Sequence, residues 1–106
     1  MKKLLVASDL FPAVVSGEKR ITIRPDYRDF EPGDVIRIEN AEDSDQFVER
    51  TVFEVLKFFR ACMIPSRYIK EDGFGSDVEM YDVMQRFYSD FNELSPVTVI
   101  YWSLPL

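Results

Sequence analysis

Short segments that alternate between apolar and polar residues, each bounded by a turn signal, constrain the fold of this chain most. Residues 20–24 (Arg-Ile-Thr-Ile-Arg) alternate strictly and are followed by Pro25, which is a pattern typical of a half-buried β-strand. Residues 35–39 (Val-Ile-Arg-Ile-Glu) repeat this alternation directly after a Pro-Gly-Asp turn signal at residues 32–34. Both segments therefore predict strands of a sheet.

The remaining elements are predicted on either side of these two strands. Further strands are expected at residues 4–7, 97–103 and 47–59, the last paired with residues 35–39 as a hairpin across an acidic loop at 40–45. A short helix is expected between a cap at Ser8 or Asp9 and a stop at Gly17, and another at 65–70. A longer helix, with Phe87 among its core residues, is expected after a capping box at 76–79. Because the strands mostly follow one another, we expect an α+β fold, a small and mostly antiparallel β-barrel flanked by two or three helices. A chain of 106 residues is expected to form a single domain over residues 1–106.

Residue types that are missing from the sequence exclude several kinds of site. The sequence has no histidine and one cysteine, Cys62, which excludes a Ser-His-Asp triad, a His-ligated metal and an intrachain disulfide. No metal and no cofactor is expected. Cys62 follows a strand rich in Phe and Val, so we expect a buried, inert thiol.

The charge of the chain limits its partners. The formal net charge is −6 and the isoelectric point is about 4.6, which argues against general electrostatic binding to duplex DNA. The apolar run at residues 4–7 is too short for a signal peptide or a membrane span. We therefore expect a cytoplasmic protein that binds neither duplex DNA nor a membrane.

The stretch from Gly17 to Arg24 carries the candidate chemistry. Strand alternation places Arg20, Thr22 and Arg24 on one face, and an exposed sheet face is the ordinary interpretation of such a pattern. A more specific interpretation comes from the spacing of Gly17, Lys19, Thr22 and Arg24, which reads Gly-x-Lys-x-x-Thr-x-Arg.

This motif, followed by Asp-Phe-Glu-Pro-Gly-Asp-Val at residues 29–35, resembles the ASCH domain family over nearly the whole chain. The resemblance implies the PUA-like β-barrel fold and one ASCH domain. At this length the chain is most similar to the small bacterial amidohydrolases of N4-acetylcytidine. That similarity implies that Lys19 and Thr22 act with a downstream carboxylate; we choose Glu71, with Asp72 as the alternate.

A mechanism without histidine is chemically sound. Thr22 would attack the acyl carbon, and Lys19 would take its proton if desolvation or neighbouring cations lower the pKa of that amine. Glu71 would protonate the departing N4 of cytidine or hold the base, and Arg24 would bind the carbonyl oxygen or the oxyanion. The residues expected to bind the substrate are Arg20, Arg24, Tyr27 and Asp72.

One geometric requirement follows from the odd spacing of Lys19 and Thr22. In a regular strand the two side chains point to opposite faces, so Lys19 has to lie in the turn before the strand, with Gly17 bending the chain. The alternative function is a non-catalytic ASCH module that binds a short single-stranded RNA or a nucleotide through its basic side chains. A scaffold that binds a protein partner is a third option, which nothing in the sequence favours.

Overall fold

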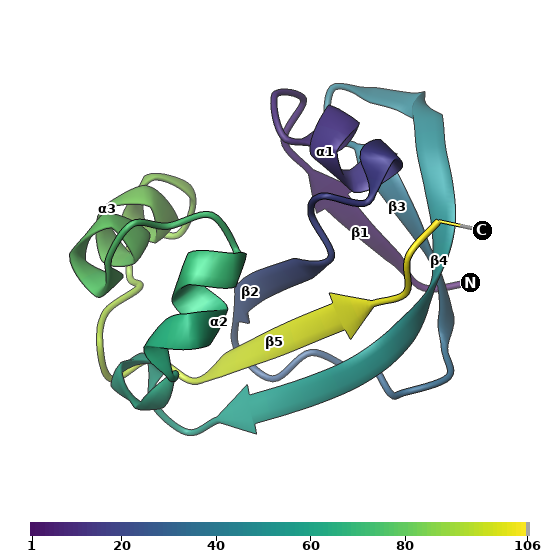
Figure 1. Cartoon of the computed structure of the whole chain (residues 1–106). Coiled ribbons are helices and arrows are strands. Elements are labelled where there is room, and N and C mark those ends of the chain that lie inside the picture. The colour runs from purple at the N-terminus through teal and green to yellow at the C-terminus, as the bar shows by residue number, and fades with distance from the viewer. Residues whose placement is uncertain (106) are drawn as a thin grey trace. The chain divides into compact units, whose positions relative to one another are not determined.

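The computed structural model describes residues 1–105, which form five β-strands and three α-helices (Figure 1). In chain order the elements are β1 (Lys3–Val6), α1 (Phe11–Ser16), β2 (Ile21–Pro25), β3 (Val35–Asn40), β4 (Asp43–Phe58), the 3₁₀ turn η1 (Ala61–Met63), α2 (Ser66–Glu71), α3 (Asp77–Phe87) and β5 (Val97–Trp102). The strands hydrogen bond in the order β1-β3-β4-β5-β2. The α+β class expected from the sequence is confirmed.

The chain divides into two compact units. The first contains Met1–Arg20, Phe30–Val55 and the C-terminal residues from Tyr101, and the second contains Ile21–Asp29 and Leu56–Ile100. A single domain over residues 1–106 stays a prediction. Among the described residues, no helix is both long enough and apolar enough to cross a membrane.

The first unit is built around three paired strands. β1 pairs in parallel with β3, with Leu4 opposite Ile38, and β3 pairs antiparallel with β4, with Ile38 opposite Val48. Leu4 and Ile38 are both buried, because the period of two turns every second side chain of a strand towards the core. The hairpin of β3 and β4 was predicted, but β4 begins at Asp43, so it takes in much of the expected acidic loop.

Helix α1 lies between β1 and β2 in the sequence and ends where the sequence predicted. Gly17 follows its last residue with a φ of 91°, a left-handed conformation that glycine adopts without strain. The start differs from the prediction. Leu10 occupies the N-cap position without a side-chain hydrogen bond, whereas Ser8 and Asp9 were the expected caps.

The second unit holds α2 and α3, and α2 contacts both β2 and α3. The predicted capping box at the start of α3 is present, because the Ser76 hydroxyl oxygen accepts a hydrogen bond from the Glu79 amide at 3.1 Å. The buried stripe of α3 consists of Met80 and Met84, which are one helical turn apart. Phe87, which was expected in the core, is exposed at the last turn.

The structure also corrects the prediction for the cysteine. Cys62 is exposed and lies in η1. Its neighbour Ala61 and the following Ile64 are buried, so this tight turn directs those two side chains inward and leaves the thiol outside.

Candidate functional site

Strand β2 positions the hydroxyl that the sequence singled out. Thr22 is only 5% exposed, so the exposed sheet face considered above does not apply to it. The side chain of Arg24 runs back along the strand, and its Nε donates a hydrogen bond to Thr22 Oγ1 at 3.0 Å. The two side chains meet because residues two apart in a strand share a face.

This contact sets the chemistry that the Thr22 hydroxyl can perform. Its oxygen accepts from a guanidinium, so its own proton is directed elsewhere and can pass to a base. A positive charge at hydrogen-bond distance also favours negative charge that develops on that oxygen. The hydrogen bond therefore occupies the Thr22 oxygen and leaves its proton free to point away from Arg24.

Asp72 joins the end of α2 to β2. It is the C-cap residue of α2, and its Oδ2 accepts a hydrogen bond from the Ile23 amide at 3.1 Å. That amide belongs to the peptide bond between Thr22 and Ile23, so the carboxylate lies next to the candidate nucleophile along the strand. The preceding residue, Glu71, is the last of α2 and is exposed.

Lys19 and Arg20 precede β2 and belong to the first unit. The Lys19 amide donates to the Ala13 carbonyl oxygen at 2.9 Å, so Lys19 lies in the turn between α1 and β2, as the odd spacing requires. Arg20 Nε donates to the carbonyl oxygen of Trp102 at 3.2 Å, and the Trp102 amide donates to the Arg20 carbonyl oxygen. The approach of the Lys19 amine to the Thr22 hydroxyl stays a prediction.

Tyr27 is presented on a tight loop directly after β2. Its side chain is 52% exposed, and the preceding Asp26 has a φ of 67°. The hydroxyl of Thr98 holds this loop at both ends, because it donates to the Asp26 carbonyl oxygen at 2.7 Å and accepts from the Arg28 amide at 2.8 Å. The role of Thr98 was not predicted, although a threonine among the apolar residues Val97, Val99 and Ile100 was a signal.

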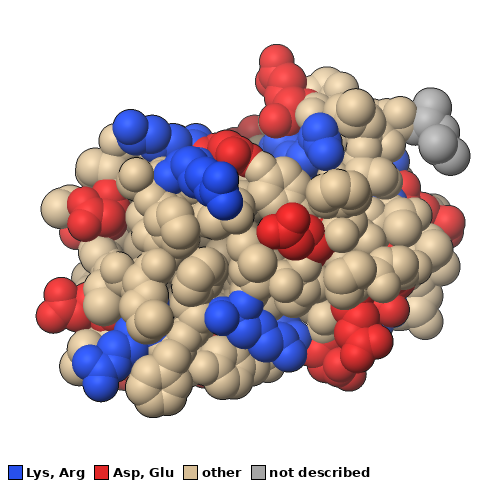
Figure 2. Space-filling model, turned by 60° about the horizontal axis from the view of Figure 1, so that its bottom comes forward, with Lys and Arg blue, Asp and Glu red and all other residues tan. Residues whose placement is uncertain are grey.

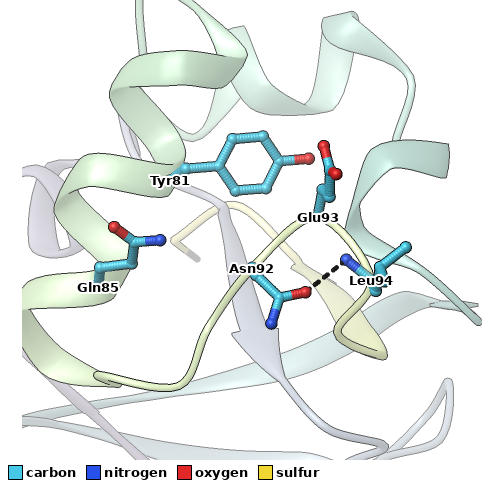
Figure 3. A pocket seen from close by; sticks show the side chains of 5 residues that line it. All are labelled: Tyr81, Gln85, Asn92, Glu93 and Leu94. Carbon is cyan, nitrogen blue, oxygen red and sulfur yellow. Dashed lines mark hydrogen bonds between the residues drawn. The ribbon is translucent and has the colours of Figure 1, made fainter.

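The cavity on the second unit lies apart from the predicted site residues. A surface cavity of about 470 Å³ lies on the second unit, lined by Tyr81, Gln85, Asn92, Glu93 and Leu94 (Figure 3). None of the predicted site residues lines it. Within residues 1–105, no group of three or more His, Cys, Asp or Glu side chains is placed to hold a metal ion.

Comparisons with known proteins identify the family and the fold. A family model described as a domain of unknown function, DUF3850, matches residues 1–72. A search of curated proteins finds no match. An ASCH domain from Lactobacillus crispatus has a similar structure, with a TM-score of 0.73, 13% identity, and coverage of 91% of this chain and 70% of that one.

Two further solved structures are also similar to this chain. ASCH from Zymomonas mobilis matches with a TM-score of 0.68 and 16% identity over 95% of this chain and 65% of that one. A protein of Enterococcus faecalis described by the family model DUF984 matches with a TM-score of 0.71 and 16% identity over 98% of this chain and 80% of that one. At these identities the likeness shows the fold, as predicted from the sequence motifs. The chain belongs to the DUF3850 family and has the fold of ASCH domains.

Proposed function

We propose that this chain is an amidohydrolase that removes the N4-acyl group from a modified cytidine nucleoside. The observation that carries the proposal is the buried Thr22 hydroxyl, held by the Arg24 guanidinium at 3.0 Å. The sequence motif that contains both residues resembles that of the small bacterial N4-acetylcytidine amidohydrolases. Acyl transfer through a threonine also needs a base next to the hydroxyl, and the proposal assigns that part to Lys19.

In the proposed reaction, Thr22 Oγ1 attacks the acyl carbon while the amine of Lys19 takes the hydroxyl proton. The negative charge that develops on the carbonyl oxygen is stabilised by the Arg24 guanidinium. The bond to N4 then breaks, a carboxylic acid donates a proton to the departing cytidine, and the acyl group stays on Thr22 as an ester. Water hydrolyses the ester, which releases the carboxylate and restores the hydroxyl.

The adjacent carboxylates of Glu71 and Asp72 have different roles in the proposal. Asp72 accepts from the Ile23 amide, so its part in the proposal is to hold the end of α2 against β2 and to shape the substrate site. Glu71 is exposed, so in the proposal it is the acid that gives a proton to the leaving N4. Arg20 and Tyr27 are proposed to contact the nucleoside, Tyr27 by stacking on the base.

The proposal is tested by measuring cytidine released from N4-acetylcytidine by the purified chain. Thr22→Ala is expected to lower the rate by roughly a thousandfold or more, since it removes the nucleophile. Thr51→Ala is the matched control, because Thr51 is an exposed threonine on β4, and it is expected to keep the full rate. Glu71→Gln is expected to lower kcat, while Asp72→Asn, which keeps an acceptor oxygen for Ile23, is expected to have the smaller effect.

Absence of cytidine release at micromolar enzyme would count against the hydrolase. The alternative is a binding module, favoured by the exposed ring of Tyr27, and its signature is salt-sensitive binding of short single-stranded RNA that survives Thr22→Ala. The face drawn in Figure 2 shows Lys and Arg side chains interspersed with Asp and Glu side chains. That mixture favours a small substrate over a long nucleic-acid strand.

A further inference from the structure

The cavity on the second unit is formed by α3 and by the segment that follows it (Figure 3). Helix α3 supplies Tyr81 and Gln85, and the chain supplies Asn92, Glu93 and Leu94 on its way to β5. The cavity is an open surface depression of about 470 Å³, because Gln85, Asn92, Glu93 and Leu94 are exposed and Tyr81 is half-buried. None of the five lining residues belongs to the proposed hydrolase site.

The two amide side chains of this cavity are engaged in holding its wall. Gln85 Nε2 donates to the Phe91 carbonyl oxygen at 2.9 Å. Asn92 Oδ1 accepts from the Leu94 amide at 2.8 Å, and Asn92 Nδ2 donates to the Asp90 carbonyl oxygen at 3.2 Å. These bonds fix the loop from residue 90 to residue 94 against the end of α3, so the cavity is formed before any ligand arrives.

Two polar groups that line the cavity take no part in holding its wall. Within residues 1–105, the Glu93 carboxylate and the Tyr81 hydroxyl make no hydrogen bond or ion pair, and the hydrogen bond of Glu93 to the Cys62 amide uses its backbone oxygen. Figure 3 shows the hydroxyl end of Tyr81 directed towards the Glu93 carboxylate. The Tyr81 ring lies tilted against Phe91, with the ring centres 5.9 Å apart.

The charge state of these groups is set by their surroundings. Partial burial raises the pKa of Tyr81, and the nearby Cys62, Asp77 and Glu93 raise it further. The phenol therefore stays neutral around pH 7, where Glu93 supplies the charge of the cavity lining. A carboxylate without a partner, beside the hydroxyl end of Tyr81 (Figure 3), offers a cation a negative charge and a second oxygen acceptor.

We infer that this cavity binds a small organic cation, a primary ammonium group carried on a short apolar chain. The ammonium contacts the Glu93 carboxylate and the Tyr81 hydroxyl oxygen, and the apolar chain covers Leu94, which is 57% exposed. The net charge of −6 raises the local concentration of such a cation near the protein. Association is therefore expected to weaken as salt is added.

The experiment is a titration of the full chain followed by amide chemical shifts in NMR spectra. n-Butylammonium chloride is the probe, and n-butanol is the neutral control of the same chain length. Saturable shifts are expected at the amides of Cys62, Glu93 and Leu94 with the ammonium. The alcohol is expected to bind roughly tenfold more weakly or not at all, because it offers no charge-assisted hydrogen bond to the carboxylate.

Three variants complete the test. Glu93→Gln is expected to weaken binding of n-butylammonium roughly tenfold, and Tyr81→Phe to weaken it severalfold by removing the hydroxyl oxygen that accepts from the ammonium. Glu42→Gln removes the same charge from the exposed turn between β3 and β4 and is expected to leave the affinity unchanged. Equal affinity for alcohol and ammonium, or equal losses in Glu93→Gln and Glu42→Gln, would overturn the inference. Cytidine release from N4-acetylcytidine is expected to be unaffected by all three variants.

Discussion

The contact between Asp72 and the backbone of β2 yields the sharpest stability prediction. In Asp72→Ala, the Ile23 amide loses its carboxylate acceptor at 3.1 Å. Ile23 is 2% exposed, so little water can replace that acceptor. A hydrogen bond to a charged group contributes about 1.5–3 kcal/mol, and partial exposure of the carboxylate places this bond at about 1–2 kcal/mol.

Two companion variants separate the hydrogen bond from general effects. Asp72→Asn retains an oxygen that can accept from Ile23 without the charge, so a loss of about 0.5–1 kcal/mol is expected. Glu71→Ala removes the adjacent exposed carboxylate and is expected to stay within about 0.5 kcal/mol of the parent chain. Asp72→Ala is therefore expected to destabilise the chain most, Asp72→Asn less, and Glu71→Ala least.

Urea denaturation followed by far-UV circular dichroism measures these differences. With a slope of about 1.5 kcal/mol per molar urea, Asp72→Ala is expected to lower the midpoint by roughly 1 M. The midpoint for Glu71→Ala is expected to move by less than about 0.3 M. Equal midpoints for Asp72→Ala and Glu71→Ala would refute the claim that the Asp72 carboxylate supports β2.

Two further outcomes follow from other parts of the structure. Gly17→Ala is expected to lower stability by about 1–2 kcal/mol in thermal denaturation, since φ is 91° and the new Cβ would lie 2.9 Å from Pro105 Cδ; an unchanged melting temperature would contradict this. The Glu31 amide, and then the Lys2 ammonium, hold the pKa of Asp34 below its ordinary value of 3.8. Its stabilising contribution is therefore complete above about pH 4 and is lost as the pH falls through the lowered pKa. In Asp34→Asn, the free energy of unfolding should fall less steeply with decreasing pH between pH 2 and 5 than in the parent chain. The same pH dependence in both chains would show that Asp34 does not cause the loss.

Much of the fold was predictable because its signals are local. The alternation of residues 21–24 and 35–39 specified two strands without reference to the rest of the chain, and Gly17 marked the end of α1. The parallel pairing of β1 with β3 was not predictable in this way, because it joins segments separated by about thirty residues. The exposure of Cys62 was missed for the same reason, since burial depends on which neighbours a turn directs inward.

In the candidate site, too, the contacts between residues close in sequence were predictable and those between distant residues were not. Strand alternation placed Thr22 and Arg24 on one face, and the structure adds that their side chains are hydrogen bonded. The contact of Asp72 with the Ile23 amide spans 49 positions in the sequence, so no local pattern could have indicated it. The role of Thr98 in holding the Tyr27 loop depends likewise on bonds to residues about seventy positions away.

The most direct measurement of the central claim is whether the acyl group becomes attached to Thr22 during turnover. The chain is mixed with N4-acetylcytidine, quenched in acid within one turnover, digested and analysed by mass spectrometry. An acetyl group is expected on the hydroxyl of Thr22 in the parent chain, and none in Thr22→Ala. Release of cytidine with no acetyl group on Thr22, or with the acetyl group on Lys19 instead, would contradict the proposed mechanism.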